Sequence, residues 1–216
     1  MRIVASLTDP ALVITAAAAG ADLVELRLDL MEGDRAEGVL ECRQQTQLPI
    51  IATLRSVDEG GKYFGNAEEW FRAVQPVLPH VDFVDIEQRF STHAETIRAQ
   101  DVTVIASFHT PGMPSLFELF GRERELRAYG DIPKIVVTPR HEEDIIEMIA
   151  FTHAARKPVC TGVMGEGFRY ARLILPLFGS EFIYCHAGAP TADGQYSIAE
   201  AKAAMGLLGA GAKKDS

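Results

Sequence analysis

The sequence contains few cysteines and no long apolar run. Its three cysteines, Cys42, Cys160 and Cys185, are odd in number and lack Cys-x-x-Cys spacing, so we expect reduced thiols rather than disulfides or metal ligands. No uncharged stretch of about 18 apolar residues occurs, which argues against a membrane-spanning helix. The chain begins directly with the strand-like segment 2–6 and leaves no room for a signal peptide. These features predict a cytoplasmic protein without a membrane partner.

Positive charge is also scarce. The 216 residues include 21 lysines and arginines against 30 aspartates and glutamates, a net charge of -9. Because phosphate backbones bind to basic faces, we expect no nucleic-acid partner. Arginine still outnumbers lysine fifteen to six, which leaves guanidinium groups available for small anions. The sequence shows no His-x-His pair or comparable ligand cluster, so we predict no metal site.

Strand-like and helix-like segments alternate eight times along the chain. The predicted strands are 2–6, 22–28, 50–54, 82–87, 102–108, 132–137, 158–163 and 181–186, and the predicted helices are 10–19, 35–47, 66–78, 91–99, 115–128, 140–155, 169–177 and 197–208. Eight such units predict a single-domain α/β fold, a parallel (β/α)8 TIM barrel. We assign the barrel to residues 1–210 and a polar tail to 211–216. The alternative, an open doubly wound sheet, usually has a glycine-rich loop after its first strand, and segment 6–10 has none.

Lys134 lies in the short apolar segment 131–139, which is bracketed by prolines. Such a β-branched run is typical of a buried strand in a parallel sheet. Burial removes water from the amine and disfavours its charged form, so the neutral amine can attack a carbonyl carbon. The alternative is that Lys134 is buried only to neutralise a carboxylate.

Charged residues are also predicted inside the barrel. In the second strand, Glu25, Arg27 and Asp29 alternate with apolar residues, so the charged side chains should face the barrel axis. Buried charges are costly unless they pair or bind a ligand. A Glu25–Arg27 ion pair that only fills the pore is the alternative to a binding site.

Polar residues recur where the predicted strands end, which is where active sites of such barrels are built. A glycine-containing loop that includes Glu59 follows the third strand and is suited to closing over a site. These strand-end residues are Arg55, Glu59, Asp85, Glu87, His109, Arg169 and Arg172, and the loop 189–195. A lysine for imine formation, a histidine for proton transfer and arginines for a carboxylate indicate imine-based catalysis on a polar keto acid.

The six histidines do not fit the role of base equally well. His109 ends the strand that precedes the strand of Lys134, and consecutive strands of such a barrel are neighbours. We therefore predict that His109 is the base. His141, at a helix start, and His186, at the end of the last strand, remain rivals.

Six motifs in order resemble type I 3-dehydroquinate dehydratase, a Schiff-base-forming enzyme of the shikimate pathway. They are Glu25-Leu26-Arg27-Leu28-Asp29, Thr53-Leu54-Arg55 with Glu59-Gly60-Gly61, Asp85-Ile86-Glu87, Ser107-Phe108-His109, Lys134-Ile135-Val136, and Met164-Gly165 followed by Arg172. The resemblance spans nearly the whole chain. It implies syn dehydration of 3-dehydroquinate to 3-dehydroshikimate, the third step of the pathway, in a homodimer without metal or organic cofactor.

The resemblance also implies residue roles. Lys134 would form the imine with the C3 ketone, His109 would move the C2 proton, and Glu59 would orient His109. The implied substrate-binding residues are Ser6, Glu25, Arg27, Arg55, Arg172, Thr191 and Gln195. Asp193 replaces the proline usual in the family's last loop, and Arg169 competes with Arg172 for the substrate carboxylate.

Two other functions remain open at this point. A class I aldolase should carry a phosphate-binding glycine loop after the seventh and eighth strands, whereas Arg172 and Gln195 suit a carboxylate and hydroxyls. A non-catalytic barrel that binds a small anion should bind dehydroquinate without turning it over.

Overall fold

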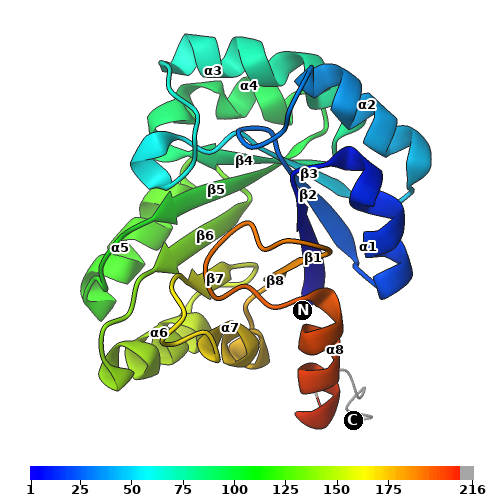
Figure 1. Ribbon diagram of the computed structural model, residues 1–216. Helices are drawn as coiled ribbons and strands as arrows, with labels where there is room; N and C mark the ends of the chain where they lie inside the picture. Colours follow the sequence, from blue (N-terminus) through cyan, green and yellow to red (C-terminus); the bar gives the residue numbers. More distant parts are fainter. Residues whose placement is uncertain (210–216) are drawn as a thin grey trace.

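The computed structural model describes residues 1–209 (Figure 1). Residue 210 and the predicted tail 211–216 lie outside this part of the chain. Within it, eight strands alternate with helices, and each predicted strand is present close to its expected bounds. The strands are β1 (Arg2–Leu7), β2 (Leu23–Arg27), β3 (Ile50–Thr53), β4 (Phe83–Glu87), β5 (Thr103–His109), β6 (Ile132–Val137), β7 (Cys160–Val163) and β8 (Phe182–His186).

The predicted helices are present too and surround the strands (Figure 1). Three of them, α3, α5 and α8, begin with a capping box in which a Glu at the third position binds the cap residue. The α-helices are α1 (Val13–Ala19), α2 (Arg35–Gln45), α3 (Ala67–Val74), α4 (Ala94–Arg98), α5 (Leu116–Arg127), α6 (Glu142–Ala154), α7 (Ala171–Ile174) and α8 (Ile198–Leu207). Short 3-10 helices are η1 (Pro10–Leu12), η2 (Val57–Glu59), η3 (Gln75–His80), η4 (Gln88–His93) and η5 (Leu175–Phe178). Within residues 1–209, no helix has the length and apolar character needed to cross a membrane.

The strands form a nearly closed parallel barrel, which confirms the predicted fold class. Hydrogen-bonded neighbours run from β7 back to β1 in chain order, and β1 also pairs with β8. An open doubly wound sheet is therefore wrong for this chain, because its first and last strands would not pair around an axis. Within residues 1–209, no strand ladder joins β7 to β8. At this seam, the Ser180 hydroxyl accepts from the Thr161 amide at 2.9 Å and donates to the Thr161 carbonyl at 3.1 Å.

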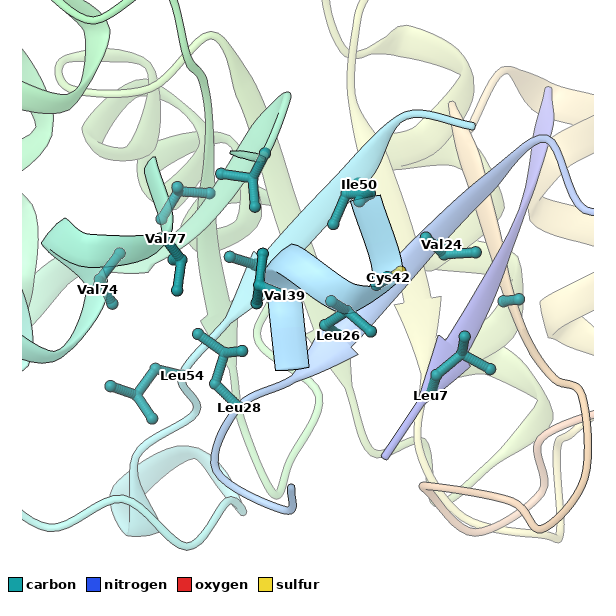
Figure 2. Packing of buried hydrophobic residues seen from close by; sticks show 14 of the residues in the cluster. Leu7, Val24, Leu26, Leu28, Val39, Cys42, Ile50, Leu54, Val74 and Val77 are labelled. Carbon is teal, nitrogen blue, oxygen red and sulfur yellow. The ribbon is translucent and has the colours of Figure 1, made fainter. Parts of the chain in front are cut away.

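The main core lies between the strands and the surrounding helices. The apolar residues that alternate with the charged ones in β2 pack outward as predicted, against α2 and its neighbours (Figure 2). Val24, Leu26 and Leu28 are fully buried there together with Val39 and Cys42. The alternation of β2 thus places its charged side chains on the lumen side, because successive residues of a strand face opposite ways.

A second apolar cluster fills the amino-terminal half of the lumen. It is made of Val4, Leu23, Ile51, Ile105, Ile132, Cys160 and Phe182. The Arg2 guanidinium covers this floor, since its carbon lies 4.8 Å from the centre of the Phe182 ring and 5.8 Å from that of Phe83. Water and ligands can therefore reach the lumen residues through the carboxyl-terminal mouth.

Candidate active site

A cavity of roughly 350 Å³ opens at the carboxyl-terminal ends of the strands. All ten predicted site residues line it, although they come from segments far apart in the sequence. They are Ser6, Glu25, Arg27, Arg55, Glu59, His109, Lys134, Arg172, Thr191 and Gln195. The structure thus brings together in one place the residues that the sequence analysis selected.

Four side chains from the even-numbered strands form one layer across the lumen. Glu25, Asp85, Lys134 and Tyr184 come from β2, β4, β6 and β8, the alternate-strand arrangement that is usual inside such barrels. The Lys134 nitrogen lies 2.9 Å from Asp85 Oδ2, 3.9 Å from Glu25 Oε1 and 4.0 Å from the centre of the Tyr184 ring. The amine therefore faces the cavity and is held between two carboxylates and an aromatic face.

Lys134 has the carboxylate partner that the alternative interpretation required. Its side chain is buried, and its hydrogen bond to Asp85 neutralises the charge inside the barrel. Burial would raise the pKa of Asp85, but Arg55 and Lys134 outweigh burial and hold that pKa well below its usual range. Pairing and reactivity are compatible here, because the same amine also borders the cavity.

Glu25 and Arg27 do not form with each other the ion pair that was the alternative to a binding site. Arg27 instead binds both carboxylate oxygens of Asp29, at 2.9 and 2.8 Å. Glu25 accepts hydrogen bonds from the hydroxyls of Ser6 and Thr53, at 2.5 and 2.8 Å. The pore-filling pair was a wrong interpretation, since the partner of Arg27 lies two residues along the chain and outside the central layer.

Arg55 connects three carboxylates near the mouth. Its guanidinium donates to Asp85 at 2.8 Å, to Glu87 at 3.1 Å and to Glu59 at 3.2 Å. Burial alone would lower the pKa of Arg55, but these carboxylates raise it above its usual value, so Arg55 keeps its charge. A single buried cation thus holds the acidic groups of β4 and of the β3 loop in fixed positions.

His109 is paired with Glu59 as predicted. Its Nδ1 lies 2.8 Å from Glu59 Oε2, and the same oxygen accepts from the His109 amide at 3.1 Å. If Nδ1 carries the proton and donates it to this oxygen, the other ring nitrogen is free to accept one from a ligand. Burial, assisted by Arg55 and Lys134, lowers the pKa of His109 well below 6.5 and keeps the imidazole neutral near pH 7.

The pKa of the Glu59 carboxyl group is shifted upward, in the opposite direction to that of His109. Burial raises its pKa to about 8, with Glu87 and Asp85 adding to the effect and Arg55 opposing it. A carboxyl group that titrates close to neutral pH changes its charge at little free-energy cost. Glu59 can therefore balance positive charge that appears on His109.

The loop that carries Glu59 depends on a glycine for a close approach. A Cβ atom at Gly61 would lie 2.2 Å from the Arg55 carbonyl oxygen, so a side chain there would displace the loop. The loop is tied back by the Gly61 amide, which donates to the Ser56 carbonyl at 2.7 Å. Gly61 thus allows the loop that carries Glu59 to fold back closely against the backbone of Arg55.

Three residues that competed for roles in the sequence are not among the residues that line the cavity. In the described chain, His109 lines the cavity, whereas the side chains of His141 and His186 are not among its lining residues. Arg172 lines it too, but Arg169 does not and instead lies with its guanidinium carbon 4.0 Å from the centre of the Tyr196 ring. The geometry favours His109 and Arg172 over these rivals.

The loop after β8 covers one side of the cavity. The Thr191 hydroxyl donates to Ser6 at 2.9 Å, and the Thr191 amide donates to the Gln195 side chain at 2.8 Å. Arg172 Nη2 donates to the Asp193 carbonyl oxygen at 3.0 Å. A Cβ atom at Gly194 would lie 2.5 Å from the Gly165 carbonyl oxygen, so this glycine lets the loops after β7 and β8 touch.

Two residues of the site were not selected from the sequence as site residues. Asp85 was noted only as one of two acidic residues on β4, and Tyr184 was not singled out at all. The signal was present for both, since each occupies an inward position on an even strand. This signal could be interpreted only with knowledge of which side chains meet across the lumen, because β4 and β8 are each separated from β6 by another strand.

Comparisons with known proteins agree with this geometry. The chain matches the family described as "Type I 3-dehydroquinase" over residues 3–212. It is 60% identical over 208 residues to a 3-dehydroquinate dehydratase of Methanoregula boonei, which covers 96% of this chain and 100% of the relative. A second such relative, from Methanospirillum hungatei, is 36% identical and covers 98% of this chain and 82% of its own length.

A solved structure supports the same assignment. The 3-dehydroquinate dehydratase of Geobacillus kaustophilus superposes with a TM-score of 0.89 at 25% identity, covering 98% of this chain and 92% of that one. Both the structural and the sequence match to 3-dehydroquinate dehydratases extend over nearly the full chain, so the class I aldolase alternative is not supported. The protein belongs to the type I 3-dehydroquinase family.

Proposed function

We propose that this protein dehydrates 3-dehydroquinate to 3-dehydroshikimate through a Schiff base on Lys134, and so serves the shikimate pathway. The observation that carries the proposal is the position of Lys134. Its amine borders the cavity. His109 lies on the adjacent strand, two residues beyond the residue that pairs with Lys134 and therefore nearer the mouth. The names of the relatives, which describe 3-dehydroquinate dehydratases, support the choice of substrate.

The first half of the reaction forms the imine. The Lys134 ammonium group gives up one proton, the resulting amine adds to the C3 carbonyl carbon, and the proton returns to the departing oxygen, so that loss of one water molecule leaves a protonated imine. Asp85 and Glu25, at 2.9 and 3.9 Å from the nitrogen, stabilise the positive charge there. The imine makes the C2 proton more acidic, because the electrons of the breaking C–H bond can move onto the cationic nitrogen.

The second half removes the C1 hydroxyl. The neutral imidazole of His109 takes the C2 proton, and an enamine forms. The electrons then return to make the C1–C2 double bond while the C1 hydroxyl leaves with the proton from His109, as water. Since one group serves both steps, proton removal and loss of the hydroxyl take place on the same face, a syn elimination. Water finally hydrolyses the product imine and restores the Lys134 amine.

The remaining polar groups would bind the substrate. Arg172 lines the cavity, and its guanidinium Nε is buried without a hydrogen-bond partner in residues 1–209. Such a group suits a carboxylate bound through two parallel hydrogen bonds. Ser6, Thr191 and Gln195 form a chain of hydroxyl and amide groups that also lines the cavity, suited to the substrate hydroxyls.

Borohydride trapping tests the proposal. Reduction during turnover should attach the substrate skeleton to Lys134, located by peptide mass, and Lys134→Met should abolish the adduct. Lys157→Met is the matched control, since Lys157 lies outside the cavity and donates to the Ala155 carbonyl at 3.1 Å. An adduct on any lysine other than Lys134, or turnover by Lys134→Met, would contradict the mechanism. The homodimer and the cytoplasmic location stay predictions; the oligomeric state can be measured by light scattering.

A further inference from the structure

Tyr184 occupies the fourth position of the layer that surrounds the Lys134 nitrogen. Asp85 on β4 and Tyr184 on β8 lie on either side of β6, each separated from it by another strand. The centre of the Tyr184 ring is 4.0 Å from Lys134 Nζ, and the ring also borders the cavity. A cation over an aromatic face at this distance is attracted by the negative face of the ring, most strongly where water is excluded.

The ring and the two carboxylates interact with the Lys134 nitrogen in different ways: the carboxylates accept hydrogen bonds from its N–H groups, whereas the ring attracts its positive charge. An ammonium ion has three N–H donors and can serve several acceptors, whereas a protonated imine has a single N–H. Once the imine forms, Asp85 and Glu25 compete for that one donor. The attraction to the ring depends on positive charge and not on an N–H group, so it persists when the amine becomes an imine.

The hydroxyl of Tyr184 does not account for its position. Its oxygen is buried and has no hydrogen-bond partner in residues 1–209. Burial, with Cys160 nearby, raises the pKa of Tyr184 well above 10, so the phenol is uncharged and is not an anionic partner for Lys134. The aromatic face is the part of this side chain that meets the reacting nitrogen.

We propose that Tyr184 is a positioning residue that holds the Lys134 nitrogen in place and stabilises it as a cationic imine through its ring face. This inference rests on the proposed Schiff-base function. It predicts that the ring matters and the hydroxyl does not. Removing the ring should reduce kcat roughly 10- to 30-fold, the range expected for a water-excluded cation and ring.

Two variants and a matched control test the inference. Tyr184→Phe keeps the ring and should change kcat by less than about 3-fold, whereas Tyr184→Leu should show the full loss and less borohydride-trapped imine at steady state. Phe83→Leu is the control, because Phe83 lies two residues before Asp85 on the same face of β4, packs in the floor of the lumen near Arg2 and does not line the cavity. It should lower thermal stability as Tyr184→Leu does, yet leave the trapped fraction unchanged.

Comparing the two variants separates stabilisation of charge by the ring from packing by the side chain. An equal loss of kcat in Tyr184→Phe and Tyr184→Leu, or a trapped fraction in folded Tyr184→Leu that equals the wild-type fraction, would overturn the inference.

Fluorinated phenylalanines at position 184 keep the test decisive if Tyr184→Leu fails to fold. Each added ring fluorine weakens the negative face with little change of shape, so log kcat should fall steadily along the series. A flat series would overturn the role of the ring. Borohydride trapping of the wild type is measured first. If no adduct forms on Lys134, the proposed function is overturned as well. If the adduct forms normally but its amount does not change with substitutions at position 184, only this inference is overturned.

Discussion

The two sides of the barrel differ in how their polar groups are satisfied. From β2 to β6, the strands are joined by continuous ladders, and the inward carboxylates share Arg55, Lys134 and several hydroxyls at 2.5–3.2 Å. On the side of β7 and β8 the ladder is interrupted. Five buried side-chain polar atoms lack a partner in residues 1–209, and four of them lie on this side, in Arg169, Arg172, Tyr184 and His186.

This difference suggests a division of labour. Groups that move protons need fixed geometry before the substrate arrives, and the network around Arg55 provides it. A group that binds an incoming anion needs free hydrogen-bonding capacity, and Arg172 has it. The connected side would thus hold the chemistry, and the incompletely paired side would receive the ligand.

The largest effect should come from breaking the connected side. Arg55→Met leaves Asp85, Glu87 and Glu59 without their shared cation, and breaking a buried ion pair costs about 3–5 kcal/mol. The free energy of unfolding, measured by urea denaturation, should fall by that amount. Arg122→Met, which removes a partly exposed pair with Glu125, should cost about 1 kcal/mol or less. Equal losses in both variants would contradict the comparison.

Removing the base should affect the rate nearly as strongly. We expect His109→Ala to lose about 10²–10⁴-fold in kcat while the imine on Lys134 still forms. His153→Ala, an exposed histidine on α6, is the control and should retain wild-type kcat. Near-normal turnover by His109→Ala would move the role of base to another group.

The same variant should change the dependence of stability on pH. The pKa of His109 is lowered in the folded protein, so the unfolded chain binds a proton there near pH 6.5 and the folded protein does not. The wild type therefore loses stability from this residue as the pH falls below about 6.5. His109→Ala removes that loss, and its stability relative to wild type should improve between roughly pH 7 and 5 in urea denaturation.

A smaller effect is expected from Arg172→Lys, on the side of β7 and β8. Loss of two-point binding should raise KM about 10-fold or more, with a change in stability of less than about 1 kcal/mol. Arg169→Lys should leave KM nearly unchanged, because Arg169 does not line the cavity. The reverse result would assign the carboxylate to Arg169.

The most local effect should come from the seam itself. Ser180→Ala removes the hydroxyl that bonds both the amide and the carbonyl of Thr161, which should cost about 1–3 kcal/mol of stability. Hydrogen exchange should accelerate at the Thr161 amide more than at the amides of β3 or β4. Uniform acceleration would mean that Ser180 supports the whole barrel rather than the junction of β7 and β8.

Much of the fold and the site could be predicted because their signals are local. The alternation of β2 placed Glu25 inward, and the position of Lys134 in an apolar strand marked it as buried. The consecutive order of strands in a barrel placed His109 beside it. Tyr184 and Asp85 escaped selection, because their relation to Lys134 runs across the lumen between strands that are not neighbours.

The amino-acid pattern by itself determined which segments become strands, which faces turn inward and which end of the barrel is polar, since these follow from the two-residue period and from the cost of burying charge. The partners that charged residues find on other strands were decided by tertiary structure alone. Arg55 binds Asp85 and Glu87 of β4, and Lys134 of β6 binds Asp85, because the strand register sets which side chains meet in the lumen. That register is a property of the closed barrel and not of any one strand.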